Sequence, residues 1–139
     1  MANRLEGWEL ALDDAISDAL LQPYVLGEHD CFRLACRVVE LLTGVDRWSE
    51  FAGKYKTRRQ AERLLAVHGS TFELAGDWFF GSPHKPSALA ARGDICCVET
   101  EDGVKHLGIC IGKFAALLGP DGLVFLPTLG ARCAWRIGE

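Results

Sequence analysis

Apolar and polar residues follow a helical period in the first half of the chain and a shorter, strand-like period in the second half. Apolar residues recur at steps of three or four across residues 5–20, with acidic residues between them. This pattern predicts an amphipathic helix that ends before Pro23. A second run, residues 31–42, is apolar over a wide face and is followed by Gly44, which favours a buried helix closed by a glycine.

The middle of the chain carries weaker signals. Thr57 and Gln60 match a capping box, which predicts a short helix that ends near Gly69. Residues 70–91 show no sustained period and contain two prolines, although the run Trp78–Phe80 is strongly apolar. We expect an irregular, packed connector here, with one short strand at most.

From residue 94 onward, short apolar runs alternate with turn signals. The expected strands are 94–100, 104–112, 114–118, 123–126 and 133–137. Helices followed by an antiparallel meander predict the α+β class. Because no linker, repeat or low-complexity segment interrupts residues 1–139, we expect a single domain.

Composition excludes several classes of protein. With 139 residues, 49% of them hydrophobic and 24% charged, the chain can bury a real core. Its net charge of −4 gives no indication of nucleic-acid binding, and the basic cluster in residues 54–63 is interpreted as a solvated helix face. No apolar run approaches the ~20 residues of a membrane span. Residues 1–9 lack the apolar region of a signal peptide, so we expect synthesis in a cytoplasm.

Candidate chemistry begins at Asp30 and Cys31, where a loop meets the second predicted helix. Aspartate is a preferred N-cap, and the capped helix start places Cys31 at the positive end of the dipole. That position favours the nucleophilic thiolate, whereas the carboxylate of Asp30 opposes it. His106 stands at the start of a predicted strand. A cysteine at a helix start and a histidine on a strand are the two halves of a thiol-hydrolase site.

Three segments, in this order, resemble the NlpC-type cysteine peptidase superfamily. Residues 23–31, PYVLGEHDC, resemble the family's entry to its nucleophile helix. Residues 91–95, ARGDI, resemble the opening of a family strand, and residues 106–112, HLGICIG, resemble the strand that carries the family's histidine. The compact form, which ends in AWRIG at residues 134–138, looks most like small proteins of phage tail gene clusters.

The resemblance implies a papain-like, NlpC-like fold in which N-terminal helices pack on a small antiparallel sheet. It implies that Cys31 is the nucleophile, that His106 is the general base, and that Tyr24 lines the site from the preceding loop. The implied substrate is a peptide or amide bond, most characteristically in the stem peptides of cell-wall peptidoglycan. No cofactor is implied.

Two departures from the family pattern concern the site. Phe32 and Arg33 follow the cysteine where the family usually has Ser-Gly, and the strand at 114–118 is entirely apolar where the family has a polar residue that orients the histidine. The expected partner of His106 is therefore a backbone carbonyl or water, with Asp121 and Thr128 as alternatives. These departures leave open a catalytically silent domain with the same fold.

The sequence also contains other candidate arrangements of histidine and cysteine. His29 is close enough in sequence to be the partner of Cys31, but a single tight loop suits a substrate cleft poorly. Three groups of cysteines, Cys96–Cys97, Cys110 and Cys133, could converge on adjacent strands. Adjacent cysteines point to opposite faces of a strand, and their spacing does not match that of structural zinc sites, so we expect no metal.

The resemblance also implies a setting. We expect a subunit of a phage tail, most characteristically the tail tip, that is assembled in the host cytoplasm and resides in the virion. Its partners would be other tail proteins and peptidoglycan peptide. The run Trp78–Phe80 is the expected centre of an interface, because aromatic residues are enriched at such sites.

Overall fold

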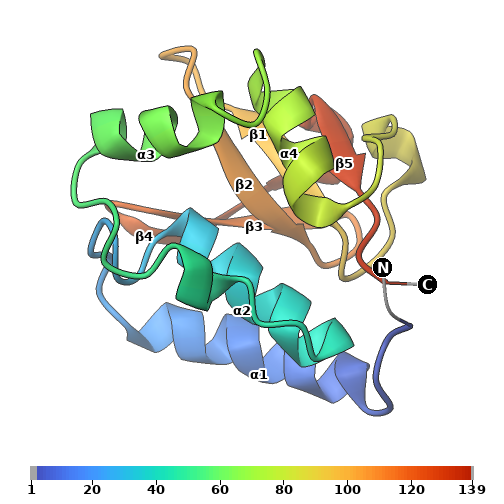
Figure 1. The fold of residues 1–139 in the computed structure, drawn as a ribbon. Coiled ribbons are helices and arrows are strands. Elements are labelled where there is room, and N and C mark those ends of the chain that lie inside the picture. Colours follow the sequence, from blue (N-terminus) through green and yellow to red (C-terminus); the bar gives the residue numbers. More distant parts are fainter. Residues whose placement is uncertain (1–2, 139) are drawn as a thin grey trace.

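A five-stranded antiparallel sheet, in the order β4-β3-β2-β1-β5, forms the scaffold on which helices pack (Figure 1). The computed structural model describes residues 3–138. Its helices are α1 (Trp8–Leu21), α2 (Cys31–Thr43), α3 (Arg58–Ala66) and α4 (Phe72–Phe80). Its strands are β1 (Ile95–Glu99), β2 (Lys105–Cys110), β3 (Phe114–Gly119), β4 (Gly122–Pro127) and β5 (Cys133–Trp135). The predicted α+β class is confirmed.

Most predicted elements form near their expected bounds because their local signals are satisfied. The Asp30 side chain caps α2 by accepting a hydrogen bond from the Arg33 amide at 2.8 Å. Gly44 ends the same helix with φ of 80°, a conformation that glycine adopts without strain. Thr57 and Gln60 form the complete capping box of α3. Strands β1 to β4 form the expected meander, and β5 returns to pair with β1.

The expectation of an irregular connector at residues 70–91 is wrong, because α4 occupies its first half. The Thr71 side chain caps α4 at the Leu74 amide, and Gly81 ends it in the left-handed conformation. The consecutive aromatics conceal the helical period: Phe79 and Phe80 are buried, whereas Trp78 is 42% exposed. The threonine before the helix and the glycine after it are the sequence signals that could have identified α4.

A close approach between α4 and β5 joins the helices to the sheet. The Trp135 ring is fully buried, and a Cβ atom at Gly76 would lie 2.1 Å from it. Only glycine at this position allows the ring to pack against α4. The main core cluster therefore extends from α1 and α2, through Phe79 and Phe80, to the inner side of the sheet.

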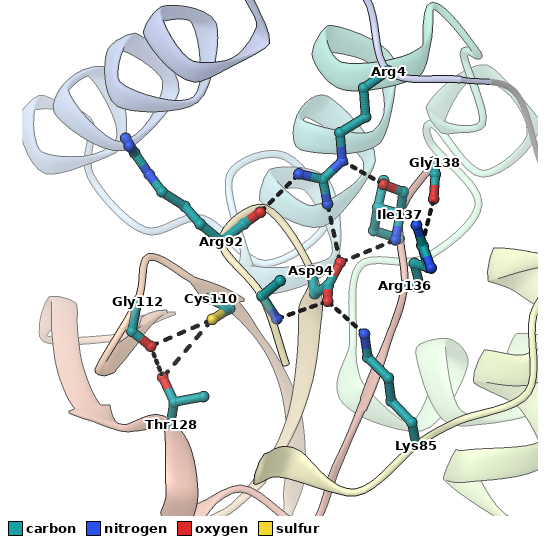
Figure 2. A network of polar contacts seen from close by, with 11 residues as sticks. Arg4, Lys85, Arg92, Asp94, Cys110, Gly112, Thr128, Arg136, Ile137 and Gly138 are labelled. Carbon is teal, nitrogen blue, oxygen red and sulfur yellow. Dashed lines mark hydrogen bonds and ion pairs between the residues drawn. The ribbon is translucent and has the colours of Figure 1, made fainter. Parts of the chain in front are cut away.

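A buried carboxylate connects both ends of the described chain. Asp94 is 1% exposed; its Oδ1 accepts hydrogen bonds from Arg4 at 3.0 Å and from the Ile137 amide at 3.2 Å (Figure 2). Its Oδ2 accepts hydrogen bonds from Lys85 at 2.8 Å and from the Ala91 amide at 2.9 Å. Because two cations and two amides surround it, the buried charge is well compensated.

None of the helices within residues 3–138 has the length and apolar character that crossing a membrane requires.

The Asp94 network predicts a large effect of one substitution. Asp94→Ala leaves the partly buried Arg4 and Lys85, and the buried Ile137 amide, without their shared acceptor, and should lower the free energy of unfolding by about 3–5 kcal/mol. Asp13→Ala is the matched control, since its ion pair with Arg92 lies at the surface and should contribute less than about 1 kcal/mol. Urea titrations measure both variants, and equal losses would contradict the assigned role of Asp94.

Candidate active site

A cavity of about 970 Å³ brings together the three site residues predicted from the sequence. Tyr24, Cys31 and His106 all line it, although they come from a loop, a helix start and a strand. Helices α3 and α4 and the turn between β1 and β2 contribute further walls. Segments that are distant in sequence therefore form one solvent-accessible space around the candidate nucleophile and base.

The loop before Cys31 is held in place by the Asp30 carboxylate. Besides capping α2, this buried group accepts hydrogen bonds from the Gly27 amide at 2.8 Å and from the Tyr55 hydroxyl at 2.6 Å. Gly27 has φ of 88°, and a Cβ atom there would lie 2.4 Å from the Tyr55 carbonyl oxygen. Glycine at position 27 is thus required by both conformation and space.

Cys31 is the first residue of α2 and lies against strand β2. It packs against both core clusters, one of which contains Leu107 on β2. Burial of the thiol raises the pKa of Cys31 to about 11, while a hydrogen bond from the Leu107 backbone lowers this pKa and the Asp30 charge raises it. At neutral pH the thiol is therefore protonated. The thiolate expected from the helix dipole is not the resting form, because desolvation outweighs the dipole.

His106 is half-buried at the start of β2. Burial lowers the pKa of its imidazole, Arg58 lowers it further, and Asp102 raises it. The ring is therefore neutral at physiological pH and able to accept a proton. Among residues 3–138, no hydrogen bond joins the His106 ring to the Cys31 thiol; instead, Nε2 of His106 lies 3.4 Å from Oγ1 of Thr100.

The polar partner of His106 is Thr100, the last residue of the strand predicted at residues 94–100. The Thr100 hydroxyl donates a hydrogen bond to Asp102 Oδ1, and both residues line the cavity with His106. The pattern Thr-x-Asp-Gly before a strand is the available signal, since such turns hold a side-chain hydroxyl near the strand start.

The other polar residues predicted as partners of His106 lie away from the cavity. Thr128 is buried and donates a hydrogen bond to the Gly112 carbonyl at 2.8 Å (Figure 2). Asp121 is exposed in the turn between β3 and β4, and neither residue lines the cavity. His29 also lies outside the cavity lining, and its Nδ1 is 3.1 Å from the Pro23 carbonyl oxygen.

Tyr24 lines the same cavity as Cys31 and interacts with it electrostatically. Burial raises the pKa of this phenol, and the nearby Cys31 and Asp30 groups raise it further. A protonated phenol at this position can donate a hydrogen bond to an oxygen atom of a bound molecule.

The cavity lining combines apolar and charged side chains. The apolar ones include Phe32 from α2 and Phe79 and Phe80 from α4. The charged ones include Arg58 and Lys105. The space can therefore accept a molecule that has an apolar part beside a polar, amide-like part.

The four cysteines on the strands are distributed as the alternation of side chains along a strand requires. Cys97 lies directly opposite Cys133 in the register of β1 and β5, in the main core cluster. Cys96 and Cys110 lie in the second cluster, on the other face. Within residues 3–138, no three histidine, cysteine or acidic side chains converge as metal ligands do.

The chain belongs to the family described as Domain of unknown function (DUF6950), which it matches over residues 3–137. This match covers nearly all of the fold, including Cys31, His106 and the Thr100–Asp102 turn. A comparison with curated proteins finds no match.

The charges around His106 predict opposite effects of two substitutions. Asp102→Asn removes a charge that raises the pKa of His106 and should lower it, whereas Arg58→Gln should raise it. Titration of the imidazole resonances by NMR measures both shifts. Shifts of the same sign would contradict this placement of the two charges. Asp121→Asn is the control for the loss of one surface carboxylate.

Proposed function

We propose that this protein is a thiol peptidase or amidase, with Cys31 as the nucleophile and His106 as the general base. The supporting observation is the shared cavity, which the helix-start cysteine and the strand-start histidine both line although they come from distant segments. Tyr24 completes the set of residues that the sequence pattern associates with this chemistry. The Cys31 backbone amide, at the start of α2, is available to a developing oxyanion.

The protonation states suit a step in which proton transfer accompanies attack. Near neutral pH both the thiol and the imidazole are uncharged. His106 takes the thiol proton as the Cys31 sulfur bonds to the carbonyl carbon, and the imidazolium then protonates the leaving amine as the C–N bond breaks. Water hydrolyses the resulting thioester, which releases the acid and restores the thiol.

The proposed substrate is a peptide or amide bond of cell-wall peptidoglycan, and the proposed setting is a phage tail tip. Both rest on the resemblance of the three segments to the NlpC-type superfamily and of the compact chain to tail-cluster proteins. The cavity supports an amide substrate, because it combines apolar walls with polar groups near the thiol. Other tail proteins are the proposed partners in the virion.

A structural role in a tail assembly is the second candidate function. It is favoured by the high pKa of Cys31, about 11, which weakens the thiol as a nucleophile. In that case the domain is a structural subunit of the tail, and the cavity is an active site that has lost its activity. The aromatic interface expected at residues 78–80 is reduced to Trp78, since Phe79 and Phe80 belong to the core.

A hydrolysis assay separates the two functions. Purified peptidoglycan fragments are incubated with the protein, and new amine termini are identified by mass spectrometry. Cys31→Ala should abolish cleavage, and His106→Ala should reduce the rate by about 10²–10⁴-fold, the usual contribution of a general base. His29→Ala is the matched control, because that ring lies outside the cavity lining and its loss should leave the rate unchanged.

Two outcomes would contradict the enzymatic proposal. One is cleavage that persists in Cys31→Ala, which would assign the activity to another group or a contaminant. The other is an absence of cleavage by the unmodified protein across peptidoglycan fragments and simple amide substrates. Detection of the chain in purified tails would then favour the structural role.

A further inference from the structure

We propose that Thr100 and Asp102 are positioning residues that hold the His106 ring for proton transfer from Cys31. This inference rests on the proposed function, and it assigns a role to a turn that precedes the histidine strand. The apolar strand β3 offers no side chain for that task. The segment between β1 and β2 offers the Thr100 hydroxyl next to the ring and the Asp102 carboxylate next to that hydroxyl.

The hydrogen bonds run in one direction through the three side chains. Thr100 Oγ1 donates to Asp102 Oδ1 and lies 3.4 Å from His106 Nε2. A hydroxyl whose hydrogen is directed to a carboxylate presents its lone pairs elsewhere, so it accepts from an imidazole N–H. The arrangement therefore favours the tautomer with its proton on Nε2. Nδ1 is then the unprotonated nitrogen, available to take the thiol proton.

The turn is built to keep these side chains in place. The Thr100 amide donates a hydrogen bond to the Val104 carbonyl at 2.9 Å, and the Val104 amide donates one to Asp102 Oδ1 at 3.2 Å. Gly103 adopts φ of 80° and donates its amide to the Thr100 carbonyl at 2.9 Å. The carboxylate thus has a backbone partner as well as the hydroxyl, which limits its freedom.

Thr100 and Asp102 have different effects on the His106 ring. Arg58, from α3, and Asp102, from the turn, are the charged groups that act on the His106 ring, with opposite signs. Asp102 offsets part of the effect of Arg58 and of burial, and so preserves the basicity of the ring. Because Asp102 is exposed, water and salt screen its charge, and Thr100 carries the larger share of the positioning.

The test compares three substitutions with two controls. Thr100→Val keeps the shape of the side chain but removes the hydroxyl, Thr100→Ser restores the hydroxyl, and Asp102→Asn removes the charge. Asp121→Asn removes a carboxylate from the turn between β3 and β4, and His106→Ala removes the base. Circular dichroism and thermal unfolding establish that each variant is folded.

The first readout is the tautomer of His106, which imidazole ¹⁵N chemical shifts report without any substrate. In the unmodified protein the neutral ring should carry its proton on Nε2. Thr100→Val should produce a mixture of tautomers, and Thr100→Ser and Asp121→Asn should not. An unchanged tautomer in Thr100→Val would overturn the proposal, whether or not the protein is an enzyme.

The second readout is the His106-dependent part of kcat/KM and its pH profile. Thr100→Val should lower kcat by about 10–100-fold with little change in KM, less than the loss in His106→Ala. Thr100→Ser should recover most of the rate. Asp102→Asn should shift the acidic limb of the profile to lower pH, because the pKa of His106 falls.

The two proposals fail in different ways. If His106→Ala does not affect the rate, the hydrolase proposal fails and the positioning role falls with it, even where the tautomer responds to Thr100. If His106→Ala abolishes cleavage while Thr100→Val and Asp102→Asn match the unmodified protein, the hydrolase proposal stands and the positioning proposal is overturned.

Discussion

The buried carboxylate of Asp30 is the interaction on which the candidate site depends. One side chain caps α2, holds the loop through Gly27 and orients Tyr55 from a separate segment. A buried charge with three donors is stable, whereas the same charge with a missing donor would carry a large desolvation cost. The position of Cys31 follows directly, since it is the next residue. The Asp30 carboxylate that positions Cys31 also raises the pKa of its thiol. The same group therefore places the cysteine in the cavity and makes it less reactive.

Local signals were sufficient to predict most of the fold. The caps of α2 and α3, the glycine after α2 and the turns between strands each depend on a few neighbouring residues, and each formed as expected. Helix α4 was missed because its apolar face borders a third aromatic residue, Trp78, that lies at the surface. Trp78 differs from Phe79 and Phe80 in its position relative to the core, and tertiary packing alone defines that position. The space that Gly76 leaves for Trp135 is equally invisible in the sequence.

Part of the site could be predicted because it depends on local sequence signals, whereas the rest depends on tertiary packing. Cys31, His106 and Tyr24 belong to segments with recognisable order, and they line one cavity. The pKa of the thiol could not be predicted, because it depends on burial created by strand β2 and by the helices around the cavity. The partner of His106 was predicted to follow the histidine strand, where the resemblance implies a polar residue, and not to precede it. Thr100 lies 3.4 Å from the ring because antiparallel pairing folds the end of β1 back beside the start of β2, and Asp102 acts on the ring through its charge.

The Asp94 network has a consequence for how this domain can be combined with others. Arg4 binds both Asp94 and the Ile137 carbonyl, so the first and last described segments lie side by side (Figure 1). A domain whose ends adjoin can be inserted into a surface loop of a host protein, or have its ends joined and be reopened elsewhere, with little distortion. New ends opened in an exposed turn such as the one between β3 and β4 would leave the Asp30 and Asp94 networks intact. Circular permutation is thus a route by which this fold could be displayed from a larger scaffold.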